Sequence, residues 1–191
     1  MSQEEPKPTP CPPFRRIVTG HSPTGEAIIE SDQQLTPYDP LSENFPPATT
    51  ESPIGFTTLW QMNLSSFPIN ADEPCPDFNN KPVPLANPDG LTARIVNFPP
   101  GPGMMHRTLT VDFGIVLNGE MELELDNGVK TLVRQHDLVV QRGTIHAWNN
   151  PGPEPARMMF VLVASKPLKF GDKVLEPSPL PPGLDGSALG K

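Results

Sequence analysis

The distribution of proline restricts the fold of this chain more than any other feature. There are 28 prolines among 191 residues, yet the stretch from Gly103 to Asn150 contains none. Proline removes a backbone donor and breaks helix interiors and central strands. The pattern therefore disfavours a long helical bundle and predicts that the hydrogen-bonded centre of the protein lies in the proline-free stretch.

Short runs of alternating apolar and polar residues predict strands rather than helices. The runs are 14–20 and 26–30, which indicate a hairpin, then 55–63, 91–98, 104–111, 113–117, 120–125, 129–134, 137–142, 144–149 and 157–164. Asn118-Gly119 and Asp126-Asn127-Gly128 are typical of two-residue hairpin turns. Many short strands without a helix-period segment predict an all-β antiparallel sandwich or small barrel.

Charge and apolar content exclude some partners. The formal net charge is -8, which argues against binding to nucleic acid and against docking on an anionic membrane. No apolar run reaches membrane-spanning length, and the first residues lack the regions of a signal peptide. We expect no nucleic-acid partner, no membrane association and a cytoplasmic location.

Three of the four histidines lie in the proline-free stretch, and two of them belong to motifs. His106 begins the run His106-Arg-Thr-Leu-Thr-Val-Asp112, which Gly119 follows, and His146 lies in Arg142-Gly-Thr-Ile-His-Ala-Trp-Asn-Asn150. This spacing resembles the two motifs of the cupin superfamily, G-x5-H-x-H-x3,4-E-x6-G and G-x5-P-x-G-x2-H-x3-N. Thr108 replaces the second histidine of the pattern, Asp112 its glutamate and Gln141 its proline.

The resemblance covers residues 14–165 and is to small single-cupin proteins, many of them encoded in fungal natural-product gene clusters. It implies a single cupin, a jelly-roll-like antiparallel β-barrel with an N-terminal strand extension. We expect residues 1–13 to form a disordered arm, 14–165 the cupin domain and 166–191 a Pro/Gly-rich tail.

The resemblance also implies that His106, Asp112 and His146 meet inside the barrel. Six residues of straight strand would separate His106 from Asp112 by roughly 20 Å, so the chain must reverse near 108–111. Two imidazoles and one carboxylate could hold one divalent transition metal, iron or zinc. Thr108 is a poor ligand, however, and the shorter Asp112 could instead hydrogen-bond His106 or the backbone. Without a metal the same three groups would suit acid–base catalysis.

Further residues are candidates for the substrate pocket. Thr108 and Trp148 lie two residues from His106 and His146, so in a strand they share the same face. Met105 and Arg94 are also expected to reach the pocket. His136, beside Asp137, is predicted to be an exposed turn residue.

Three functions follow from this site. The first is a non-redox lyase, isomerase or cyclase step (decarboxylation, dehydration or ring closure) on a small, polyketide-type substrate of secondary metabolism, with Asp112 orienting one imidazole. The second is an Fe(II)-dependent dioxygenase with a His-Asp-His site, and the third is a non-catalytic barrel that binds a small molecule. We also expect a homodimer, because strand 14–20 could add to a sheet edge of a second subunit.

Overall fold

The computed structural model describes residues 8–64, 77–78 and 82–186. Its strands are β1 (Phe14–His21), β2 (Ala27–Leu35), β3 (Gly55–Asn63), β4 (Gly90–Phe98), β5 (Thr110–Asn118), β6 (Glu120–Leu125), β7 (Lys130–Arg134), β8 (Leu138–Arg142), β9 (His146–Asn149), β10 (Ala156–Ala164), β11 (Lys169–Phe170) and β12 (Lys173–Val174). In these ranges no helix has the length and apolar character that crossing a membrane requires.

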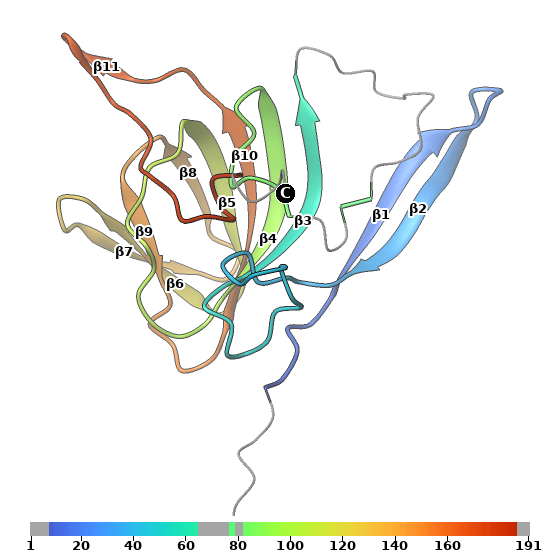
Figure 1. Ribbon diagram of the computed structural model, residues 1–191, viewed down its shortest axis with the longest axis horizontal. Helices are drawn as coiled ribbons and strands as arrows, with labels where there is room; N and C mark the ends of the chain where they lie inside the picture. Colours follow the sequence, from blue (N-terminus) through green and yellow to red (C-terminus); the bar gives the residue numbers. More distant parts are fainter. Residues whose placement is uncertain (1–7, 65–76, 79–81, 187–191) are drawn as a thin grey trace, which may run out of the picture.

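Two antiparallel sheets form the barrel (Figure 1). The larger has the order β3-β4-β10-β5-β8, and the smaller has the order β7-β6-β9. Apolar side chains from both sheets meet in one core, which includes Val96, Val116, Met121 and Met158. The predicted all-β cupin fold is confirmed.

The chain before β5 differs from the prediction. The sequence predicts two strands at 104–111 and 113–117, but β5 is a single strand and residues 104–109 lie outside it. Residues 101–106 instead run beside β9, with isolated bridges Gly101↔Asn150 and His106↔His146. Pro102 lacks a backbone donor, so a continuous ladder cannot form here. We call residues 101–106 the proline segment.

One of the two predicted hairpin turns is a corner between the sheets. β5 and β6 flank Asn118-Gly119 but belong to different sheets. Gly119 has a positive φ of 79°, and a Cβ atom there would lie 2.9 Å from the Cβ of Ala156. The turn at Asp126–Gly128 is a hairpin as predicted, since it joins the paired strands β6 and β7.

The N-terminal strands form the predicted hairpin. β1 pairs with β2 in a sheet of their own, which projects from the barrel (Figure 1). Residues 9–12, within the predicted arm, form hydrogen bonds with the rest of the chain. Cys11 N donates to Ala48 O at 2.9 Å, and Arg157 Nη2 donates to Pro12 O at 2.7 Å. Residues 1–7 of the predicted arm lie outside the described residues.

The predicted tail packs on the barrel over its described part. We call residues 176–186 the C-terminal segment. Ser178 N donates to Arg107 O at 3.0 Å, and Leu85 N donates to Leu184 O at 2.8 Å. Gly183 has a φ of 92°, and a Cβ atom there would lie 2.1 Å from Pro40 O. This segment therefore lies tightly against the loop that contains Pro40.

Candidate active site

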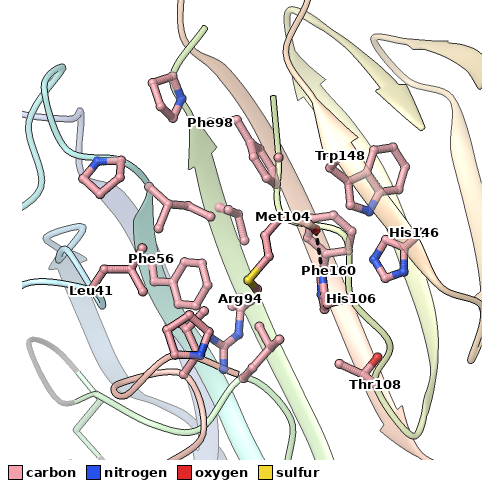
Figure 2. Close-up of a pocket in the computed structure, with 18 of the residues that line it drawn as sticks. Leu41, Phe56, Arg94, Phe98, Met104, His106, Thr108, His146, Trp148 and Phe160 are labelled. Atoms are coloured by element: carbon pink, nitrogen blue, oxygen red, sulfur yellow. Dashed lines mark hydrogen bonds between the residues drawn. The ribbon is translucent and has the colours of Figure 1, made fainter. Parts of the chain in front are cut away.

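A cavity of about 290 Å³ opens inside the barrel. Its walls are mostly apolar and include Phe56, Leu85, Val96, Phe98, Met104, Trp148, Phe160, Leu162, Pro181 and Leu184. Its polar side chains are Arg94, His106, Thr108, Asp112 and His146 (Figure 2). The volume is at the lower end of the range for small-molecule sites, roughly 300–1,000 Å³. The cavity suits a compact organic molecule.

The structure brings His106 and His146 together, as predicted. Their backbones exchange two hydrogen bonds of 2.9 Å, and their ring centroids are 4.5 Å apart. His106 Nδ1 lies 2.9 Å from Met104 O, and His146 Nδ1 lies 3.1 Å from Thr144 O. Because a carbonyl oxygen only accepts hydrogen bonds, each Nδ1 carries the proton and each Nε2 keeps a lone pair.

Burial keeps both imidazoles neutral. Burial lowers the pKa of His106, and the hydrogen bond to Met104 O partly opposes that shift. Burial also lowers the pKa of His146, and a charge on the nearby His106 lowers it further, to about 4. The first proton that enters the pair is therefore expected on His106. At neutral pH both rings offer lone pairs to a bound molecule.

Asp112 lines the same cavity but is held by other partners. Its carboxyl Oδ2 accepts a hydrogen bond of 2.9 Å from Gln141 Nε2, and the hydroxyls of Thr108 and Thr110 lie 2.6 Å from each other. Burial raises the pKa of Asp112 to about 6, while the nearby hydroxyls of Thr110 and Thr108 and the amide of Gln141 act to lower it. The expectation that Asp112 orients an imidazole is wrong, since backbone carbonyls hold both rings.

The predicted three-ligand metal site is not formed. Within residues 8–64, 77–78 and 82–186, no three His, Cys, Asp or Glu side chains are grouped closely enough to hold one ion. The two imidazoles are one ligand short of the three that catalytic zinc and mononuclear iron sites take from the protein. Asp112 lines the same cavity but does not group closely enough with the two imidazoles to complete the set. The donor set therefore does not fit a metal of this kind.

Among the pocket candidates, Thr108, Trp148 and Arg94 line the cavity, whereas Met105 does not. The Trp148 ring meets His146 edge to face at 6.5 Å. Met105 is 40% exposed and lies on the outer surface near Lys130. Its neighbour Met104 lines the cavity. Alternation from His106 could have found Met104, because residues two apart share a face.

Sequence reasoning missed the cavity residues that come from loops. Leu41, Pro53 and Ile54 precede β3, and Pro181 and Leu184 belong to the C-terminal segment. No local periodicity links them to the motifs. The apolar residues Leu180 and Leu184 in the Pro/Gly-rich tail are a weak signal of burial in the sequence.

The family model described as a cupin domain matches residues 94–162. Across 162 residues, 82% of this chain and 86% of the relative, the chain is 32% identical to oryzines biosynthesis cluster protein J of Aspergillus oryzae. It is 33% identical across 175 residues, 85% of this chain and 84% of the relative, to the cupin-domain-containing oxidoreductase virC of Hypocrea virens.

The chain belongs to the cupin family, as its motifs predicted, and its relatives include proteins of fungal biosynthesis clusters. Among solved structures it is similar to the cupin domain of Schizosaccharomyces pombe Cnp3, with a TM-score of 0.48 and 12% identity. That match covers 79% of this chain and 88% of the other.

Proposed function

We propose that this cupin enzyme acts in secondary metabolism and catalyses a non-redox proton transfer on a small organic substrate inside the barrel. The reaction class is isomerisation, dehydration, decarboxylation or ring closure. One observation carries the proposal: two neutral imidazoles, held by backbone carbonyls, each present an Nε2 lone pair in an apolar cavity. Positioned bases of this kind contribute typically 10²–10⁴-fold to proton-transfer rates.

His106 is the base in this proposal. Its Nε2 takes a proton from a carbon next to a carbonyl or carboxylate group of the substrate. In an isomerisation the same proton returns to another substrate atom, and in a dehydration it leaves with the hydroxyl group as water. His146, whose pKa is about 4, stays neutral and accepts a hydrogen bond from the substrate.

Asp112 supplies the second titrating group. With a pKa of about 6, roughly one Asp112 carboxyl in ten keeps its proton at pH 7. Its Oδ1 atom is buried without a hydrogen-bond partner. A protonated Asp112 could therefore donate to a leaving group or a carbonyl oxygen of the substrate.

An oxidative step is the second candidate, and the names of four relatives as cupin-domain-containing oxidoreductases favour it. The third candidate, a non-catalytic binding barrel, would return its ligand unchanged. The cytoplasmic location stays a prediction.

The dimer remains part of the proposal. The β1–β2 hairpin carries exposed Ile17 and Ile29, and the outer face of β5 and β8 carries exposed Phe113, Leu138 and Val140. Exposed apolar patches of this kind mark interaction surfaces. In a twofold dimer the hairpin of each protomer would cover this sheet face of its partner.

The test of the acid–base proposal needs the natural substrate, which a deletion strain of the source organism should accumulate. The purified protein should convert that compound, and His106→Gln and His146→Gln should each lower kcat by about 10²–10⁴-fold. Their circular dichroism and Tm should stay close to those of the wild type.

The matched control is His136→Asn. His136 is an exposed histidine in the turn before β8 with a φ of 74°, and asparagine tolerates that conformation. This variant should keep full activity. Full activity in both His106→Gln and His146→Gln would contradict the proposal. If the wild type returns the compound unchanged, a non-catalytic binding barrel is favoured.

A further inference from the structure

Arg94 is a buried cation in the wall of the cavity. It lies in β4, opposite Thr58 of β3 and Phe160 of β10. Its side chain is only 1% exposed and is the largest among the fully buried ones. Arginine is almost never buried to this degree unless it is paired. Arg94 therefore needs a partner for its charge.

The contacts of Arg94 leave much of its guanidinium free. Nη2 donates to the backbone oxygen of Pro84, and Cζ lies 4.6 Å from the centroid of the Phe56 ring. Nε and Nη1 are buried without a hydrogen-bond partner. The protein thus satisfies only part of a group that has five N–H donors.

No carboxylate of the described chain neutralises this charge. The four ion pairs of residues 8–64, 77–78 and 82–186 involve other cations. Asp112 lines the cavity but accepts its hydrogen bond from Gln141. It lies two strands across the sheet and two residues along from Arg94, so the two α-carbons are roughly 12 Å apart. Burial lowers the pKa of Arg94 to about 10, with Tyr38 as the opposing neighbour, so the group stays charged at neutral pH.

We infer that Arg94 binds an organic oxyanion of the substrate, a carboxylate or an ionised enol or phenol, through its free N–H donors. The inference rests on the proposed function, because the same cavity holds the substrate. Figure 2 shows Arg94 between Phe56 on one side and His106 and His146 on the other. The oxyanion would sit at Arg94, the hydrocarbon part on the apolar walls, and the reacting carbon near the imidazoles.

This position would give Arg94 a part in the reaction as well as in binding. Removal of a proton from a carbon next to a carbonyl group places negative charge on the carbonyl oxygen. A fixed cation in an apolar cavity stabilises such a charge strongly. A substrate carboxylate at Arg94 would instead fix the orientation of the molecule, as planar guanidinium donors match carboxylate geometry.

Binding of simple probes to the full chain tests the inference without the natural substrate. Isothermal titration calorimetry would compare sodium benzoate with its neutral analogue benzamide, and 4-nitrophenolate would report on phenolates. The wild type should bind at least one of the two anions more tightly than benzamide. Arg94→Met should weaken that anion by about 10- to 100-fold and leave benzamide unchanged.

Two variants serve as controls. Arg157→Met removes a half-buried arginine that bonds Asn97 and Pro12 outside the cavity, and it should bind the anions like the wild type. Arg94→Met should keep or raise the Tm of the free protein, because methionine removes an unpaired buried charge. If Arg94→Met does not fold, Arg94→Lys replaces it and should still weaken the anion, since lysine lacks the planar fork.

The outcomes separate this inference from the acid–base proposal. If benzoate binds and 4-nitrophenolate does not, the oxyanion that Arg94 binds is a carboxylate. If only 4-nitrophenolate binds, it is a phenolate or an enolate. Equal anion affinity in wild type and Arg94 variants, or no anion binding up to the solubility limit, would overturn the inference. His106→Gln should bind the anion as the wild type does. If His106→Gln is fully active and still binds the anion, the acid–base proposal is refuted while the inference about Arg94 stands.

Discussion

Burial shifts the titrating groups of the cavity in opposite directions, and this has consequences for stability. The folded pKa of His146, about 4, lies below its ordinary 6.5, so its contribution to stability is present above pH 6.5 and is lost as the pH falls towards 4. The folded pKa of Asp112, about 6, lies above 3.8. Its contribution is present below pH 3.8 and is lost as the pH rises through 6.

Asp112→Asn should reveal how strongly the lowered pKa of His146 reduces stability on acidification. Between pH 6 and 4 the two groups oppose each other in the wild type, and asparagine removes one of them. The free energy of unfolding should then fall more steeply on acidification than in the wild type, by up to about 1.4 kcal/mol per pH unit. Urea titrations at pH 4, 5, 6 and 7 measure this slope.

Asp137→Asn is the control for that series, because Asp137 lies in an exposed turn. Its slope should match the wild type. A slope for Asp112→Asn that is parallel to the wild type would contradict the pKa shift of Asp112.

Single residues of the site were predictable where local spacing determines their face. His106 and His146 follow from the motifs, and Thr108 and Trp148 from alternation with them. The partner of Asp112 was not predictable, because Gln141 faces it through the register of β5 with β8. The carbonyls that hold the imidazoles depend equally on exact backbone positions.

The proline segment, residues 101–106, runs beside β9 and so places His106 next to His146. Gly103 N donates to Asn149 Oδ1 at 2.9 Å, and a Cβ atom at Gly103 would lie 2.1 Å from Trp148 O. Only glycine allows this approach, since the atom it would meet is backbone. The segment therefore depends on Gly103 for its contact with β9.

Gly103→Ala should move the proline segment away from β9. We expect a loss of about 1–3 kcal/mol of stability and lower kcat, because His106 would leave His146. Gly152→Ala is the control, since its Cβ atom would lie 3.3 Å from Asn150 Oδ1 and 4.0 Å from Glu154 O, without the close backbone contact of Gly103. Equal activity and Tm for Gly103→Ala and the wild type would contradict this role.

Most strands could be predicted, but their pairing could not. β3 and β6 have the predicted bounds, since alternation and turn residues are local signals. Asn118-Gly119 has the composition of a hairpin turn, yet β5 pairs with β10 and β8 instead of β6. Contacts from distant segments decide which strands pair, and one sequence does not contain that information in local form.

For the whole molecule, the C-terminal segment closes part of the cavity. Leu184 is 5% exposed and belongs to the core. Leu184→Ala should lower the free energy of unfolding by about 2–3 kcal/mol and weaken the binding of cavity ligands. Leu168→Ala, at a residue that is 46% exposed, should change stability by less than about 0.5 kcal/mol. Equal effects of the two substitutions in urea titrations would contradict the packing of this segment.

The proposed dimer is tested by mass in solution. Light scattering should give twice the chain mass of 20.8 kDa. Ile29→Asp places a charge on the exposed side of the β1–β2 hairpin, where Ile29 is 62% exposed, and should shift the protein to the monomer. A monomeric wild type, or a dimeric Ile29→Asp variant, would contradict this interface.

Isotope analysis of the product tests the central claim most directly. The accumulated precursor would be converted by the wild type in deuterated water under ¹⁸O₂, and in a parallel reaction without oxygen. Proton transfer by His106 predicts equal rates in both reactions and a product without ¹⁸O. Deuterium enters a product carbon only where the proton held by His106 exchanges with solvent before it returns to the substrate. A product that contains ¹⁸O, or a reaction that stops without oxygen, would contradict the account and favour an oxidative enzyme.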